Sequence, residues 1–278
     1  MSNKLGIVCV HYDPKNVPQT LRSLDRIRQS VVARRTVLVA NHEAAWIALN
    51  EWEARRGERS ELVRHDNSGM EFGAYQAGMD RLLDENENEP EWVLFVNDTF
   101  ATHQSFGSVY RQKLAADLER RFDYPAIIGR VVSLPRSYQM DAMRTHRWVT
   151  TNLFAINRAA IRALGGRIYR SELDALIVET SDMDKFFDSR VDPVLRDHLE
   201  AWLFQARPGW HWYASDPLQP ANAAKMAHKA RSIIQEKYIG ALMEDRAAEF
   251  VNLDELSVPR KLAREMERKL FSRAPRNE

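Results

Sequence analysis

Residues 92–99 read WVLFVNDT, five apolar residues followed at once by three polar ones. A run this short, rich in valine and aromatic side chains, is typical of a strand buried on both faces of a parallel sheet. Such a strand would end at Asn97, Asp98 and Thr99. Three earlier segments repeat the pattern of an apolar run followed by a polar turn: LGIVCVHYD (5–13), TVLVANHE (36–43) and ELVRHDNSG (61–69).

Helical segments separate these four runs. Apolar residues recur at helical spacing in residues 18–32, 43–56 and 71–85. Strands that alternate with helices predict a parallel, doubly wound sheet, in which ligands bind at the carboxyl ends of the strands. A polar turn closes most strands whatever their function, but four polar ends at one edge of a sheet favour a binding site.

The composition is that of an ordinary soluble protein. Hydrophobic residues make up 44% of the 278 residues and charged residues 28%, which excludes disordered, collagen-like and fibrous classes. The single cysteine, Cys9, excludes an intrachain disulfide and a cysteine-based zinc cluster. A net charge of +1 argues against nucleic acid as a partner. The sequence shows no signal peptide and no run of ~20 apolar residues, so we expect a cytoplasmic protein.

The second half of the chain is less regular. Strands are predicted at 126–132 and 148–157, and a short helix follows that ends at Gly165-Gly166. Asp192-Pro193 opens another helix, with the aspartate as N-cap and the proline as first helical residue.

A last strand is predicted at GWHWYA (209–214), and charged helical sequence follows. The expected organisation is therefore an α/β domain over residues 1–220 and a helical C-terminal appendage over residues 221–278.

These motifs, in this order, resemble the nucleotide-sugar-binding half of GT-A glycosyltransferases. The likeness is to inverting family-2-like enzymes and to the rhamnan-synthesis-type proteins of bacterial polysaccharide assembly. It rests on HYD (11–13), DNSGMEFGAYQAG (66–78), VLFVNDT (93–99), TTNLFAINRAAIRALGG (150–166) and RDHLEAWLFQARPGW (196–210). The resemblance covers about residues 4–215 and implies a GT-A-like, Rossmann-type mixed sheet flanked by helices.

The resemblance implies a site for a nucleotide-sugar donor at the strand ends. The residues that it places there are His11, Tyr12, Asp13, Asn41, Asp66, Asn67, Gly69, Asn97 and Asp98. It also implies a divalent metal, Mg²⁺ or Mn²⁺, because carboxylate-held cations neutralise a leaving diphosphate. Asp98 would be a metal ligand and His228 a further one. The sequence departs from the family's Asp-X-Asp motif here, since Asn97-Asp98-Thr99 has one carboxylate, so that a basic side chain could replace the metal.

An inverting transfer needs a general base that deprotonates the acceptor hydroxyl. The helix VLRDHLEAWLF (194–204) offers Asp197 and Glu200 as candidates, and the sequence does not decide between them. The alternative is that both are solvated residues of an amphipathic helix.

The function that the resemblance implies is transfer of a sugar to a growing surface polysaccharide of the O-antigen or capsule type, whose acceptors are often lipid-linked. The alternative is a non-catalytic scaffold subunit that binds nucleotide sugar or glycan, which the lone carboxylate at Asp98 would suit.

The C-terminal segment VPRKLAREMERKLFSRAPRNE (258–278) predicts a basic amphipathic helix. Val258, Leu262, Met266 and Leu270 recur every four residues, and basic residues outnumber acidic ones by 7 to 3. Such a helix can lie on an anionic membrane, here the inner membrane face. The alternative is that its apolar stripe packs on the protein's own core or on a second subunit of a homo-oligomer.

Overall fold

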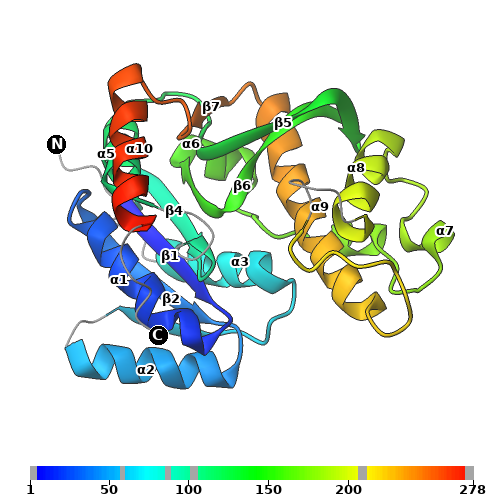
Figure 1. Ribbon diagram of the computed structural model, residues 1–278, viewed down its shortest axis with the longest axis horizontal. Helices are drawn as coiled ribbons and strands as arrows, with labels where there is room; N and C mark the ends of the chain where they lie inside the picture. The colour runs from blue at the N-terminus through cyan, green and yellow to red at the C-terminus, as the bar shows by residue number, and fades with distance from the viewer. Residues whose placement is uncertain (1–4, 57–59, 85–88, 101–105, 206–211, 273–278) are drawn as a thin grey trace.

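The computed structural model describes residues 5–56, 60–84, 89–100, 106–205 and 212–272 (Figure 1). Its strands are β1 (Leu5–His11), β2 (Ala33–Ala40), β3 (Glu61–Arg64), β4 (Trp92–Asn97), β5 (Ala126–Met140), β6 (Met143–Asn157) and β7 (Glu249–Asn252). Its α-helices are α1 (Val17–Arg28), α2 (Glu43–Arg56), α3 (Met70–Leu83), α5 (Ser108–Leu118), α6 (Arg158–Ala163), α7 (Met183–Phe186), α8 (Pro193–Phe204), α9 (Ala223–Asp245) and α10 (Val258–Ser272).

The seven strands form one mixed sheet in the order β3-β2-β1-β4-β6-β5-β7. β1 pairs in parallel with β2 and β4, and β2 pairs in parallel with β3. β6 is antiparallel to both of its neighbours, and β7 is parallel to β5. The expected α/β class, a mixed sheet flanked by helices, is confirmed.

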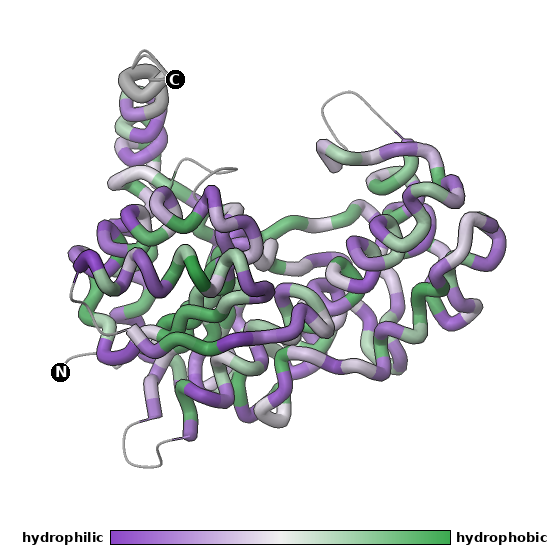
Figure 2. Tube along the Cα trace, turned by 90° about the horizontal axis from the view of Figure 1, so that it is seen from below, coloured by the Kyte–Doolittle hydropathy of each residue, from purple (hydrophilic) through white to green (hydrophobic). Residues whose placement is uncertain are grey.

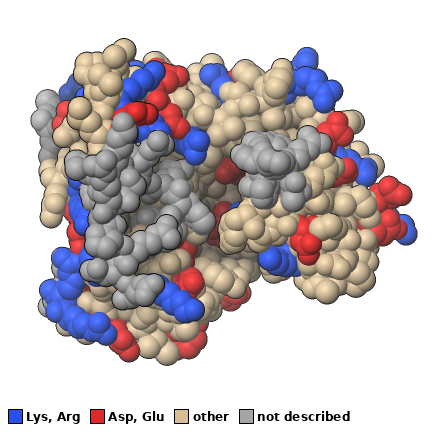
Figure 3. All heavy atoms as spheres, viewed as in Figure 1, with Lys and Arg blue, Asp and Glu red and all other residues tan. Residues whose placement is uncertain are grey.

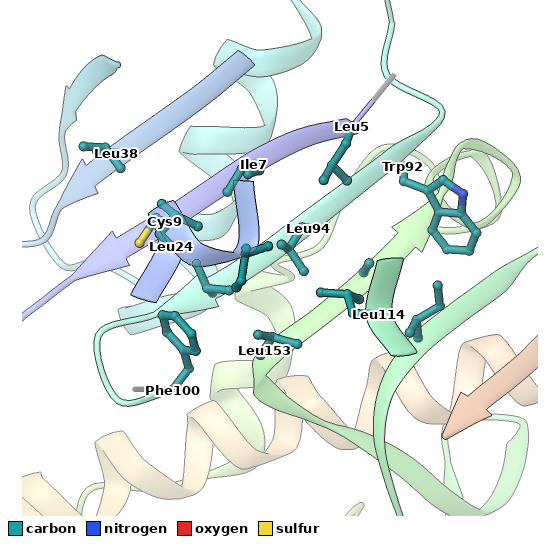
Figure 4. Close-up of a cluster of buried hydrophobic side chains, with 14 of the residues drawn as sticks. Leu5, Ile7, Cys9, Leu24, Leu38, Trp92, Leu94, Phe100, Leu114 and Leu153 are labelled. Atoms are coloured by element: carbon teal, nitrogen blue, oxygen red, sulfur yellow. The ribbon is translucent and has the colours of Figure 1, made fainter. Parts of the chain in front are cut away.

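Alternating side chains of β1 fill two cores, one on each face of the sheet. Leu5, Ile7 and Cys9 pack with residues of α1, α5 and β4 (Figure 4). Val8 and Val10 face the other side and pack with α3 and α9. Figure 2 shows the hydrophobic residues concentrated in the strands at the centre and the hydrophilic ones on the helices around them.

β5 and β6 form a long hairpin that reaches beyond the sheet. Its far end carries Tyr138, Met140 and Trp148, which pack in a third core with α8 and α9. The register of the hairpin shifts between Gly129 and Val131 and again between Ser133 and Tyr138. The hairpin thereby joins the sheet to α8 and α9.

The C-terminal region is tied to the sheet as far as Asn252. α9 packs along β6, and β7 adds a strand at the β5 edge. α10 contacts α5 and projects from the rest of the molecule (Figure 2). Residues 273–278 of the expected amphipathic tail lie outside the described residues. No described helix has both the length and the apolar character needed to cross a membrane.

Candidate active site

A cavity of about 960 Å³ lies at the carboxyl ends of β1, β2 and β4. One wall consists of the polar residues that follow these strands, and the other consists of α9 and of Trp212 and Tyr213. The face seen in Figure 3 is hollowed between the part that carries α1, α5 and α10 and the part that carries α8 and α9. The cavity is therefore where a doubly wound sheet is expected to bind its ligand.

Asp98 fixes the turn that follows β1. The carboxylate is buried, and its Oδ2 atom accepts hydrogen bonds from the backbone N–H groups of Tyr12 (3.0 Å) and Asp13 (2.7 Å). Burial raises the pKa of Asp98, the two N–H groups oppose the rise, and the negative charges of Asp13 and Glu71 add to it. Among the described residues no hydrogen bond engages Oδ1, so one carboxylate oxygen is left for a ligand.

Three buried polar oxygens that lack a hydrogen-bond partner among the described residues belong to residues that line the cavity. They are Oδ1 of Asn41, Oγ1 of Thr150 and Oδ1 of Asn152. Asn41 is only 3% exposed, and its Nδ2 donates to the carbonyl of Met70 at 3.4 Å. Because an unpaired buried acceptor costs about 1–3 kcal/mol, these atoms favour a ligand with several hydroxyl donors.

The α9 wall presents three basic side chains: Lys225, His228 and Lys229. Within the described part of the chain none of them makes a salt bridge. The Nζ atom of Lys225 lies 5.2 Å from the ring centroid of Trp212, and that of Lys229 lies 6.0 Å from the ring of Trp202. Cations held over aromatic faces without a carboxylate partner can bind an anionic ligand.

Two further carboxylates connect α9 to the rest of the cavity. Glu71, in the first turn of α3, accepts a hydrogen bond from Ser232 Oγ at 2.8 Å. Glu236 accepts from the N–H and the hydroxyl of Thr151, both at 3.0 Å, and from Lys237 Nζ at 2.9 Å. Among the described residues, Glu236 thus has three donors and fixes α9 to β6, whereas Glu71 has one.

Lys237 is a buried cation behind this wall. Its Nζ lies 3.3 Å from the centroid of the Trp148 ring, and burial lowers its pKa to about 8.

The structure brings most of the predicted donor site together. The predicted residues that line the cavity are Tyr12, Asp13, Asn41, Asn67, Asn97, Asp98 and His228. Tyr12 is 56% exposed and meets His42 edge to face, with 5.1 Å between ring centroids. This aromatic pair stands beside Asn41 at the β2 end of the cavity.

Three predicted donor residues do not line the cavity. His11 is fully buried, with Nε2 3.3 Å from Cys9 Sγ, and burial lowers its pKa to about 3. Asp66 is exposed and accepts hydrogen bonds from Ser68. Gly69 precedes α3 with a φ of 66°, and a Cβ there would lie 2.4 Å from the ring of Tyr169. These residues shape the strand ends rather than face the ligand.

The two residues predicted as catalytic base also lie away from the cavity. The Asp197 side chain is 68% exposed and lies 3.7 Å from Arg136 on β5. Glu200 pairs with Arg196, one turn earlier on α8, at 2.6 Å. Asp197 therefore lies in a surface ion pair with β5, and Glu200 in an ion pair within α8.

The sequence interpretation missed Glu71, Glu236 and Ser232. A signal existed, because Lys225, His228, Lys229, Ser232 and Glu236 recur at helical spacing in one segment and so share a face. Without the strands opposite, that stripe cannot be told from a solvated helix face.

A divalent ion fits the site only in part. The described residues contain no group of three or more His, Cys, Asp or Glu residues placed to hold a metal. Mg²⁺, however, is usually held by one or two carboxylates together with substrate phosphates and water. Asp98, through Oδ1, fits such a partial site, which a bound diphosphate would complete.

Comparison with known proteins gives little further information. No protein-family model matches the chain, and no curated protein matches it. Among the solved structures, it matches the mannosyltransferase PcManGT from Pyrobaculum calidifontis, a structure in complex with GDP-mannose and Mn²⁺. The match covers 99% of this chain and 82% of that one, with 15% identity and a TM-score of 0.44. A likeness of this size supports no assignment of activity.

Proposed function

We propose that this protein is a glycosyltransferase that transfers a sugar from a nucleotide-sugar donor to a growing surface glycan. The observation that carries the proposal is the cavity, which is lined both by basic side chains of α9 and by buried oxygens of Asn41, Thr150 and Asn152. In the described part of the chain, these cations form no salt bridge and these oxygens have no hydrogen-bond partner. A nucleotide sugar offers the matching chemistry, since it combines an aromatic base, a diphosphate and sugar hydroxyls. The family resemblance of the strand-end motifs supports the same function.

We assign the parts of the donor by their chemistry. Tyr12, Asn41 and Asn67 would bind the nucleoside, with the ring of Tyr12 offering a stacking surface. His228 and Lys229 would neutralise the diphosphate. Thr150 and Asn152 would accept hydrogen bonds from hydroxyls of the transferred sugar.

The reaction is a single displacement with inversion. The acceptor oxygen attacks the anomeric carbon while the bond to the diphosphate breaks, and a base takes the hydroxyl proton. We assign that base to Glu71, because it has fewer hydrogen bonds than Glu236 and is less buried than Asp98. A divalent ion at Asp98 would stabilise the charge that develops on the leaving diphosphate.

The test begins with donor binding. In a thermal-shift panel of nucleoside diphosphates and nucleotide sugars, one nucleotide at a hundred times its Kd stabilises the folded protein by ~2.7 kcal/mol. The double variant His228→Ala/Lys229→Ala loses this shift, and Asp98→Asn abolishes sugar transfer or donor hydrolysis. Running the panel with and without Mn²⁺ and EDTA separates a metal-assisted diphosphate site from a purely basic one. Absence of a shift with every nucleotide would contradict the proposal.

The second candidate function is a non-catalytic subunit that binds donor or glycan. It is favoured by Asp98 Oδ2, which caps a turn, and by the lack of a three-ligand metal group among the described residues. A scaffold would bind the nucleotide but neither transfer nor hydrolyse its sugar.

We also propose that the protein works at the cytoplasmic face of the membrane, on a lipid-linked O-antigen or capsule acceptor. α10 supports this, because Val258, Leu262 and Met266 are 60–70% exposed along one of its faces. Its other side is held to the protein, where Arg264 reaches Asp254 (3.6 Å) and Glu267 accepts from the N–H of Ser108 (2.7 Å).

A further inference from the structure

Two aromatic rings and a lysine line the cavity at the end of α9 that lies away from the sheet. We call these three residues the rim: Trp212, Tyr213 and Lys225. Glu236, which is bonded to β6, lies eleven residues farther along the same helix than Lys225. At 1.5 Å per residue the rim is about 16 Å from that contact. Lys225 therefore lies about three turns of α9 away from the point where this helix is bonded to β6.

The rim is held in place by α8. The N–H of Trp212 donates to the carbonyl of Trp202 at 3.1 Å, and the N–H of Asp216 donates to the carbonyl of Leu203 at 3.2 Å. The rings of Trp212 and Trp202 stack, with 6.3 Å between centroids and 21° between planes. The surface is therefore organised before any ligand arrives, which lowers the entropic cost of binding.

Tyr213 provides the accessible ring of the rim. It is 78% exposed and meets Trp212 edge to face at 5.7 Å. Aromatic faces carry partial negative charge, so they attract the partly positive C–H groups on one face of a sugar ring. Tyrosine gives this contact at low side-chain entropy cost, because it has only two rotatable bonds.

The charge on the walls changes along the cavity. The carboxylates of Asp13, Glu71, Asp98 and Glu236 line the part near the sheet, whereas Lys225 lies over Trp212 at the rim and has no salt bridge in the described part of the chain. An acidic sugar would be attracted to Lys225 at the rim. A neutral sugar would leave Lys225 without a counter-charge.

We infer that the rim binds an acidic sugar unit of the acceptor, remote from the unit that receives the new sugar, so that the acceptor is an acidic oligosaccharide. This inference rests on the proposed glycosyltransferase function. The acidic group pairs with Lys225 while its ring, or that of a neighbouring unit, stacks on Tyr213.

The experiment tests the full chain on an array of tetrasaccharides. The array contains matched pairs: one member carries a hexose where the other carries the corresponding hexuronic acid, and the two are otherwise identical. The wild type is expected to bind acidic members at least tenfold better than their neutral partners. Tyr213→Ala reduces binding to both members of each pair, and Lys225→Met removes the preference for the acidic one. Tyr124→Ala and Lys185→Ala, at exposed residues far from the cavity, serve as controls and bind as the wild type does.

Nucleotide binding is measured on the same variants by thermal shift. It is expected to be unchanged in Tyr213→Ala, because the ring of Tyr213 does not contact the donor. A loss of nucleotide binding in Tyr213→Ala would assign the rim to the donor and overturn the inference. Equal binding of acidic and neutral members, or no binding to any member, would also overturn it. Failure of the proposed function is recognised by a different result, namely that the wild type binds no nucleotide.

Discussion

Glu71 stands in the first turn of α3, with its side chain toward the cavity and one hydrogen bond, from Ser232. Glu71→Gln keeps an oxygen that can accept this bond but cannot take a proton. We expect kcat to fall by ~10²-fold or more, as for loss of a general base, while nucleotide binding is retained. Steady-state kinetics with a soluble acceptor measure both quantities.

Asp197→Asn and Glu200→Gln are the matched controls for that experiment, since both carboxylates lie on α8 outside the cavity. They are expected to keep kcat within about twofold. The assignment of Glu71 is wrong if Glu71→Gln remains fully active. It is also wrong if kcat of either control variant falls as far as is expected for Glu71→Gln.

The buried imidazole of His11 makes stability depend on pH. Its pKa is about 3 in the folded protein and near 6.5 when unfolded, so between these values the unfolded chain binds a proton that the folded chain does not. The free energy of unfolding therefore falls as the pH drops below 6.5, and His11 contributes up to about 1.4 kcal/mol per pH unit to this fall. His11→Gln should remove that part of the slope in urea unfolding measured from pH 7 to pH 4.5. An unchanged slope would contradict the argument.

The residues that could be predicted from the sequence were those at strand ends. Tyr12, Asn41 and Asp98 follow apolar runs, and the topology of parallel strands places such positions at one edge of the sheet. Asp197 shows where this reasoning stops. Whether α8 contributes to the cavity depends on how the β5–β6 hairpin and α9 pack against it, and no periodicity in residues 193–204 contains that information.

At the scale of elements, α3 packs close to the sheet because Gly78 has no side chain. A Cβ at this position would lie 2.4 Å from Cγ1 of Val8 and 3.0 Å from Cγ2 of Val39. Both valines belong to central strands and have little freedom to move. Gly78→Ala is therefore expected to destabilise the protein by about 1–3 kcal/mol, despite the better helix propensity of alanine.

Chemical denaturation of Gly78→Ala and of Asp80→Ala tests this packing. Asp80 is exposed on the same helix, so its replacement should change the free energy of unfolding by less than about 0.5 kcal/mol. Equal stability of Gly78→Ala and the wild type would mean that α3 shifts to accommodate a methyl group.

The elements predicted with the least success were those that depend on distant partners. The described part of GWHWYA, from Trp212 onward, forms a turn rather than a strand, because Trp212 stacks on Trp202 instead of pairing with the sheet; residues 209–211 lie outside the described residues. β7 was not predicted at all. Its four residues acquire a strand conformation only by pairing with residues 126–129 of β5.

At the scale of the whole molecule, the apolar face of α10 predicts membrane association. Leu262 (60% exposed) and Met266 (67% exposed) lie on the face opposite the contacts with α5. The full-length protein is expected to float with anionic vesicles at low salt, and Leu262→Glu/Met266→Glu should float several-fold less. Val178→Glu, at another exposed apolar residue, is the control.

Flotation of wild type and double variant to the same extent would show that α10 does not bind the membrane. Failure of both to bind anionic vesicles would show the same. In that case the apolar face is better explained by contact with a second copy of the chain, which sedimentation at increasing concentration would reveal.

The position of β7 has a consequence for how the protein is made. This strand covers the β5 edge of the sheet, yet it comes more than a hundred residues after β5 in the chain. While the polypeptide emerges from the ribosome, the long β5–β6 hairpin is synthesised well before its outer neighbour exists. Until residue 252 has emerged, that hairpin presents an open row of backbone N–H and carbonyl groups, a surface on which nascent chains can pair with one another. We therefore expect the interval between synthesis of β5 and of β7 to be the period in which the growing chain depends most on protection by chaperones.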